Sequence, residues 1–106
     1  MAERDIQAAI LAALAGRTDL RAWRNNAGQA KNLQTGGYVK FGVVGQADIS
    51  GILTGGRRLE IEVKGPTGRQ SEQQRRFQAM VERYGGLYIL ARSVEDVLAA
   101  LPGGAS

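Results

Sequence analysis

The chain of 106 residues contains neither cysteine nor histidine, and these two absences exclude several classes of chemistry. Without cysteine there is no disulfide framework and no thiolate metal site. Without histidine, the sequence excludes histidine-dependent nucleases, Ser-His-Asp hydrolases and histidine-ligated zinc sites. Acid–base or metal chemistry in this chain must therefore use Asp, Glu, Lys, Tyr or backbone oxygen.

The chain also lacks a long apolar run. No uninterrupted apolar segment approaches the roughly 20 residues that a membrane-spanning helix needs. The first five residues mix acidic and basic side chains, which is unlike a signal peptide. We therefore expect a cytoplasmic protein that forms one domain over residues 1–106.

Basic residues outnumber acidic ones by 14 to 10, which gives a net charge of +4 and a pI of about 10.0. A basic domain attracts polyanions, and arginine forks onto phosphate. The charge favours a nucleic-acid partner, although it would also serve solubility. The candidate phosphate contacts lie in a polar loop, in the strand after it and in a later basic cluster: Arg24, Asn25, Asn26, Gln29, Lys31, Asn32, Lys40, Arg69, Arg75 and Arg76. For each of them the alternative is a solvated surface.

The spacing of apolar residues predicts an α/β (α+β) domain, with one mixed sheet flanked by helices. The expected order is helix, three to four strands, helix, strand, helix. The predicted helices cover residues 3–15, 72–84 and 94–101, and the predicted strands cover 20–24, 38–44, 47–53, 57–64 and 87–91. Residues 25–37 are expected to form a loop, and strand 87–91 is expected in the sheet interior. The buried stripe of the second helix is predicted to be Phe77, Met80, Val81 and Tyr84.

The clearest strand carries the sequence Leu59-Glu60-Ile61-Glu62-Val63-Lys64. Its apolar residues alternate with charged ones, so the charged residues share one face. Residues two apart on a strand are about 6.5–7 Å apart, which places Glu62 beside Lys64. The alternative interpretation is a solvent-facing strand with a neutral charge pattern.

Asp48 lies in an apolar strand context, where acids are disfavoured. Gly45 before it marks a bend, and Thr54-Gly55-Gly56 after it is typical of a hairpin turn. Counting outward from that turn places Asp48 nearly opposite Glu62. Two facing carboxylates repel unless a cation or a proton lies between them, so the pair points to a metal site. The alternative is an aspartate that stabilises a turn.

Two further polar residues have both a functional and a local interpretation. Glu3 begins a helix, where an acid favours the helix dipole, and it is also a candidate metal ligand. Gln74 stands three residues after Ser71, as a capping-box partner would, and it is also a candidate to support the site. Trp23 and Tyr38 could stack on bases, although packing in the core is the favoured interpretation.

Taken together, these motifs resemble the VRR-NUC (virus-type replication-repair nuclease) family of the PD-(D/E)XK nuclease superfamily. They are Glu3 in an Ile-Gln helix, Gly45-x-x-Asp48, Glu62-x-Lys64 and Ser71-x-x-Gln74-x-x-Phe77. The resemblance extends from Glu3 to the segment that begins at Ser93. The superfamily name expects Pro-Asp, whereas Ala47 precedes Asp48 here, as is common in this family.

The resemblance implies a restriction-endonuclease-like core and Mg²⁺- or Mn²⁺-dependent cleavage of DNA. Asp48 and Glu62 would bind the metal together with the Val63 carbonyl oxygen, and Glu3 would contribute directly or through water. Lys64 would orient or activate the attacking water. Gln74, selected over Gln70 and Gln73 by its spacing from Ser71, would support the site.

The resemblance also implies a phage or bacterial protein of replication or repair that acts on branched, flap or junction DNA, in some cases as a homodimer. Two other hypotheses stay open. One is a DNA-binding module of the same fold without turnover, and the other is an interaction subunit for a replication partner such as a helicase.

Overall fold

The computed structural model describes residues 2–26, 28–31 and 34–103, and within 28–31 and 38–41 it describes the backbone alone. The elements in chain order are α1 (Glu3–Leu14), β1 (Leu20–Arg24), β2 (Gly28–Lys31), β3 (Tyr38–Phe41), β4 (Ile49–Leu53), β5 (Arg58–Val63), α2 (Glu72–Arg83), β6 (Leu87–Ala91) and α3 (Val94–Ala100).

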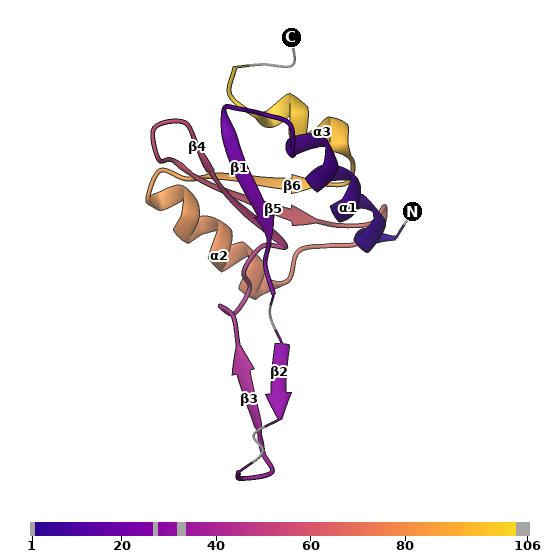
Figure 1. Ribbon diagram of the computed structural model, residues 1–106, viewed down its shortest axis with the longest axis vertical. Coiled ribbons are helices and arrows are strands. Elements are labelled where there is room, and N and C mark those ends of the chain that lie inside the picture. The colour runs from indigo at the N-terminus through magenta and orange to yellow at the C-terminus, as the bar shows by residue number, and fades with distance from the viewer. Residues whose placement is uncertain (1, 27, 32–33, 104–106) are drawn as a thin grey trace.

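Four strands form a mixed sheet in the order β1-β4-β5-β6. Strands β1, β4 and β5 are antiparallel neighbours, whereas β6 runs parallel to β5 because α2 forms the crossover between them. Helices α1 and α3 cover one face of the sheet and α2 covers the other (Figure 1). The predicted class, a mixed sheet flanked by helices, is therefore confirmed.

The main core lies between the sheet and the α1–α3 layer. Ile6, Ile10 and Leu14 recur at helical spacing along α1 and are buried against the alternate residues Leu59 and Ile61 of β5. The opposite sheet face has a much smaller apolar cluster. The described helices include none with the length and apolar character needed to cross a membrane.

The structure differs from the predicted strand order in two respects. Five strands precede α2, because the predicted loop over 25–37 contains β2, which pairs with β3 as a separate ribbon. This ribbon projects away from the body of the molecule (Figure 1). Strand β6 is at an edge of the sheet instead of its interior, and its apolar residues are explained by helices on both faces.

The predicted buried stripe of α2 is also wrong in part. Val81 is buried and Phe77 is partly buried, but Met80 is 46% exposed and Tyr84 is 79% exposed. The reason is the chemistry of the sheet face below α2. Where an apolar face would hold large side chains, that face carries Ser50, Glu60 and Glu62, so the apolar contact area is small.

Gly45 is the bend that the sequence predicts, and it also fits the turn before Asp48 against α2. Its φ is +77°, and a Cβ atom there would lie 2.4 Å from the backbone oxygen of Gln73. Only glycine allows both the left-handed backbone and this close approach. The turn is thereby held directly on the first turn of α2.

We expect Gly45→Ala to lower the free energy of unfolding by about 2 kcal/mol more than Gly55→Ala does, or about 8 °C in melting temperature. Both glycines have positive φ, but a Cβ at Gly55 meets no atom within 4 Å. The control therefore carries the backbone strain without the clash. Equal melting temperatures for the two variants would contradict the close packing described for Gly45.

Candidate active site

Asp48, Glu62, Lys64 and Gln74 come together at one end of the sheet, on the face that α2 covers. The β4–β5 register pairs Ile49 with Ile61, and one further step places Asp48 opposite Glu62. The turn between the strands lies at Thr54–Gly56, where both glycines have positive φ. The predicted hairpin and the predicted facing of the two acids are therefore confirmed.

Glu62 is the centre of this group, and it is buried, with 3% of its side chain exposed. Its Oε2 atom accepts a hydrogen bond from Gln74 Nε2 at 3.0 Å and lies 3.5 Å from Lys64 Nζ. Its Oε1 atom is buried without a hydrogen-bond partner among the described residues. The alternative of a solvent-facing charged strand is excluded, because this carboxylate is enclosed.

Asp48 is held by the backbone on both sides of it. Its Oδ2 atom accepts a hydrogen bond from the Val63 N–H at 2.7 Å, and its carbonyl oxygen accepts one from the Asn25 N–H at 2.9 Å. The Asn25 side-chain amide donates to Ala47 O and to Ser50 Oγ. Asn25 thus fixes the segment that carries Asp48, and the donor that we predicted would contact DNA is used inside the protein.

Gln74 forms the predicted capping box and also contacts Glu62, while its role in supporting a site stays a prediction. Its side-chain oxygen accepts from the Ser71 N–H at 2.8 Å, while its own N–H donates to Ser71 Oγ at 3.1 Å, which completes the predicted capping box. Because the cap occupies the amide oxygen, the amide nitrogen is directed at Glu62. Gln70 instead donates to Gln78 and to the Tyr88 hydroxyl.

The environment of Glu62 disfavours its charged form. Burial raises the pKa of Glu62 to about 7 from its usual 4.5, and the neighbouring Asp48 charge raises it as well, whereas Lys64 lowers it. A buried carboxylate with an unpartnered oxygen beside a second carboxylate requires a proton or a cation. Carboxylate oxygens are the ligands that Mg²⁺ and Mn²⁺ prefer, so these residues fit such an ion.

We expect the stability of the metal-free protein to fall as pH rises from about 4.5 to about 7. In this window Glu62 is still protonated in the folded state but is already ionised in the unfolded state. A rise in pH therefore favours the unfolded state and lowers the free energy of unfolding. The expected loss is of order 2 kcal/mol after a discount for partial hydration. Urea unfolding in EDTA across this pH range measures it, and Glu62→Gln is the control that should flatten the slope. An equal slope in both proteins would contradict this assignment.

Two residues beside the site were not among the predicted ones. Glu60 is 1% exposed; its Oε1 lies 3.5 Å from Arg58, and its Oε2 is buried without a partner among the described residues. Tyr88, on β6 opposite Glu60, has its pKa raised to about 12, chiefly by burial. The alternation along β5 signalled Glu60, since it shares a face with Glu62. No sequence signal indicated Tyr88.

Glu3 lies near Lys64 and is not grouped with the two carboxylates. A Cβ added at Gly68 would be 3.5 Å from Glu3 Oε2 and 3.3 Å from Lys64 Cδ, so both side chains contact the loop after β5. Within residues 2–26, 28–31 and 34–103, no three Asp or Glu side chains gather as a potential metal group. The side-chain ligands brought together are Asp48 and Glu62, and a contribution from Glu3 stays a prediction.

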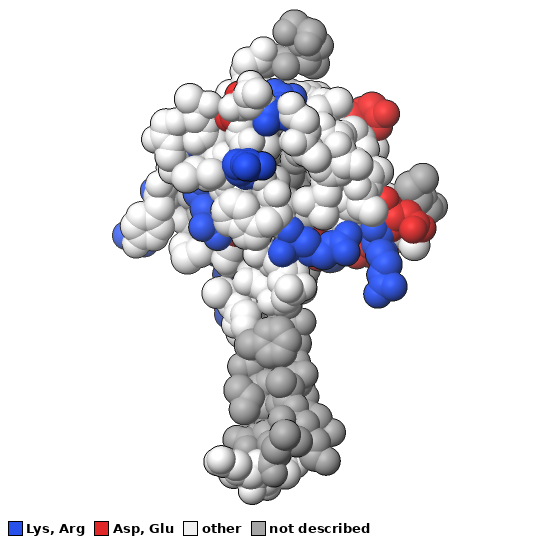
Figure 2. Space-filling model, viewed as in Figure 1, with Lys and Arg blue, Asp and Glu red and all other residues white. Residues whose placement is uncertain are grey.

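The predicted DNA contacts are distributed around this end of the molecule. Arg24 and Asn26 are exposed beside the foot of the ribbon, and Arg69 is exposed on the segment leading into α2. Arg75 and Arg76 are exposed on the first half of α2, where Arg76 pairs with Glu72. The Arg75 side chain donates to the Gln70 carbonyl. Basic side chains predominate near the base of the body, above the ribbon (Figure 2). The remaining predicted contacts lie outside the described side chains: Gln29, Lys31, Asn32 and Lys40.

No family model, no curated protein and no solved structure matches this chain in comparisons with known proteins. The functional interpretation therefore depends on the geometry of the site itself.

Proposed function

We propose that this protein is a divalent-metal-dependent endonuclease that hydrolyses phosphodiester bonds in DNA, with a restriction-endonuclease-like core. The observation that supports this best is the unpartnered Oε1 atom of the buried Glu62 beside Asp48. An isolated buried charge is costly unless it is paired or coordinates a metal. A site kept at this cost in stability is typical of function.

In this proposal Asp48, Glu62 and the Val63 carbonyl oxygen hold Mg²⁺ or Mn²⁺, and Glu3 contributes directly or through water. When bound, the ion supplies a Lewis acid that polarises the phosphoryl oxygen and stabilises the leaving oxyanion. Lys64 orients the attacking water and offsets the negative charge that develops on phosphorus. Gln74 is a positioning residue, because its hydrogen bond fixes the Glu62 carboxylate.

The substrate proposed is branched, flap or junction DNA of phage or bacterial replication and repair. The small body offers limited surface for gripping such DNA, which favours a homodimer or a replication partner such as a helicase. The exposed arginines Arg24, Arg69 and Arg75 and the net charge of +4 support nucleic acid as the substrate.

The test is cleavage of flap, nicked, four-way and linear DNA with Mg²⁺, with Mn²⁺ and with EDTA, comparing the wild type with Asp48→Asn. We expect metal-dependent cleavage that the substitution removes, since asparagine can still accept the Val63 hydrogen bond but has no charge for the ion. Cleavage by Asp48→Asn in EDTA would reject the mechanism. DNA binding without nicking would favour a non-catalytic module, and tight binding to a helicase without DNA affinity would favour an interaction subunit.

A further inference from the structure

The strand register places two further rows of residues on the same sheet face as the candidate site. Trp23 on β1 is opposite Ser50, which is opposite Glu60, and in the next row Arg21 is opposite Ile52. Directly opposed residues share a face of the sheet. The Trp23 row is two residues along the strands from the Asp48–Glu62 row, which is about 7 Å.

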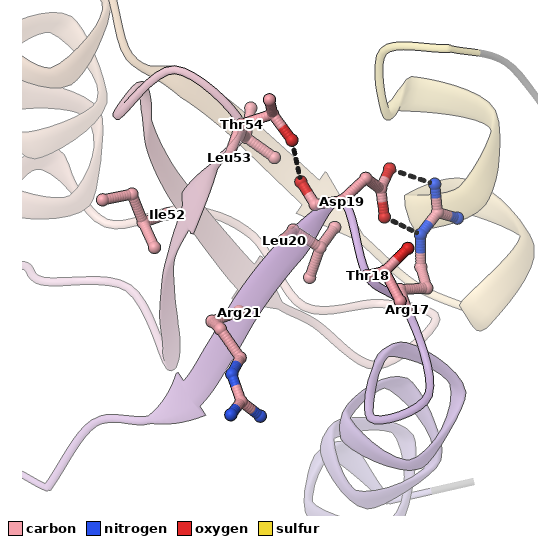
Figure 3. A pocket seen from close by; sticks show the side chains of 8 residues that line it. All are labelled: Arg17, Thr18, Asp19, Leu20, Arg21, Ile52, Leu53 and Thr54. Carbon is pink, nitrogen blue, oxygen red and sulfur yellow. Dashed lines mark hydrogen bonds and ion pairs between the residues drawn. The ribbon is translucent and has the colours of Figure 1, made fainter.

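Helix α2 covers only part of this face. Ser50 and Glu60 are each 1% exposed, whereas Trp23 and Ile52 are each 45% exposed. The side chains of Ile52 and Leu53 point to opposite faces of the sheet, and that of Leu53 is buried in the α1–α3 core (Figure 3). The β1–β4 half of the face is therefore open, and the expectation that Trp23 packs in the core is wrong.

The open half is cationic. Arg21 is exposed, and with Ile52 it lines a pocket of about 440 Å³ (Figure 3). The Arg58 side chain on the neighbouring strand contacts the buried Glu60 at 3.5 Å through its Nη2 atom, and 57% of the side chain stays exposed. At the rim of the pocket Asp19 is paired with Arg17 at 2.7 Å. The exposed charges of these two rows are thus arginines, which suit phosphate.

The same face continues as an apolar pocket beside α2. Arg58 and Glu60 line this pocket, of about 380 Å³, together with Met80 and Tyr84. Tyr84 is 79% exposed, so a second exposed aromatic ring lines the same pocket as Arg58. Aromatic rings combined with a positively charged surface are the usual means of holding unpaired bases.

We propose that the open half of this face binds a single-stranded segment of DNA, with an unpaired base stacked on Trp23 and phosphates held by Arg21 and Arg58. The proposal rests on the nuclease function above and names the form of DNA that it acts on: a strand that has left the duplex. A duplex exposes the flat faces of its bases only at its ends, so the exposed indole selects unpaired strands. The strand would then pass one row of residues from Asp48 and Glu62.

The chain has a single tryptophan, so its fluorescence reports on this surface alone. The experiment titrates a thymidine oligonucleotide into Glu62→Gln protein in EDTA, where no cleavage is required. We expect saturable quenching of Trp23 fluorescence, and clearly weaker binding of a blunt duplex of equal length at the same salt concentration. Equal affinity for the duplex would overturn the proposal.

Variants in the same background, measured by anisotropy of a labelled oligonucleotide, identify the contacts. Trp23→Ala should weaken binding about tenfold, and Trp23→Tyr should retain affinity within about threefold. Arg21→Ala should reduce the slope of log K against log salt by about 0.7, whereas Arg4→Ala, which removes an equal charge from α1, should leave affinity nearly unchanged at high salt. Unchanged binding by Trp23→Ala would overturn the proposal.

A second copy of the chain is the rival occupant of this surface. Tryptophan fluorescence that shifts with protein concentration in the absence of DNA, and does not respond to the oligonucleotide, would overturn the proposal in favour of a dimer interface. Binding is measured with Glu62→Gln protein in EDTA, and cleavage is measured with the wild type and metal. Failure of stacking with metal-dependent cleavage intact would therefore refute this inference alone, and quenching without any cleavage by the wild type would refute the nuclease proposal.

Discussion

Replacing Glu62 by glutamine is expected to reduce metal-dependent DNA cleavage by about a thousandfold, while the metal-free protein keeps or raises its melting temperature. The loss of activity follows from removing one of two charged ligands and the electrostatic stabilisation that the ion supplies. Initial rates with Mg²⁺ and Mn²⁺, together with thermal unfolding in EDTA, measure the two effects.

The retained stability follows from the contacts of this carboxylate. Glutamine can keep its oxygen at the position of Oε2, where Gln74 and Lys64 approach. Its amide nitrogen then takes the place of Oε1, which has no partner among the described residues, and brings a hydrogen-bond donor into the field of the Asp48 charge. The substitution removes the cost of burying this carboxylate and its repulsion with Asp48, which offsets the loss of the ion pair with Lys64.

These two readouts separate the proposed role from a merely structural one. A residue that only maintained the fold would lose stability and activity together when substituted. Glu62→Gln protein that unfolds at a much lower temperature, or that cleaves DNA at the wild-type rate, would contradict the assignment. Glu72→Gln is a matched control, because Glu72 is an exposed acid whose described ion pair is with Arg76 on the same helix.

Replacing Lys64 by methionine is expected to lower cleavage by about a hundredfold to a thousandfold. Methionine has a similar length and keeps the packing of the side chain, of which only 13% is exposed. What it loses is the ammonium group, 3.5 Å from Glu62 Oε2, that would orient the water and offset charge at phosphorus. Single-turnover cleavage with saturating metal is the appropriate measurement, since it isolates the chemical step.

Lys64→Met also has a signature in the metal-free protein. The Lys64 charge lowers the pKa of Glu62, so its removal should raise that pKa further. The fall of stability with rising pH would then extend to higher pH than in the wild type. Lys64→Arg keeps the charge and should keep the wild-type pH profile, although its rigid fork should reduce cleavage. Cleavage by Lys64→Met within threefold of the wild type would exclude the proposed role.

The order of residues along the chain was enough to predict most elements. The helical spacing of Ile6 and Ile10, the alternation along β5 and the capping pair Ser71 and Gln74 all act over a few residues, so they can be recognised locally. The facing of Asp48 and Glu62 followed from the same local logic, because one tight turn joins their strands and sets the register.

The ribbon and the position of β6 could not be predicted in this way. Strand β2 carries short polar residues that are equally typical of a loop, and only pairing with β3 makes it a strand. The edge position of β6 depends on which strands pair across the whole sheet. An apolar strand covered by helices on both faces looks the same at an edge as in the interior.

The sequence by itself determined which chemistry is available. It offers the carboxylates of Asp48 and Glu62 and the amine of Lys64 on two strands joined by one turn, and it contains no thiol and no imidazole. Only the tertiary structure decided that Glu62 is enclosed with one oxygen unpartnered among the described residues, and that Trp23 is left exposed on the same sheet face. Residue types and short-range spacing are properties of the chain, whereas burial depends on where α2 is placed over the sheet. That placement arises from contacts between distant segments.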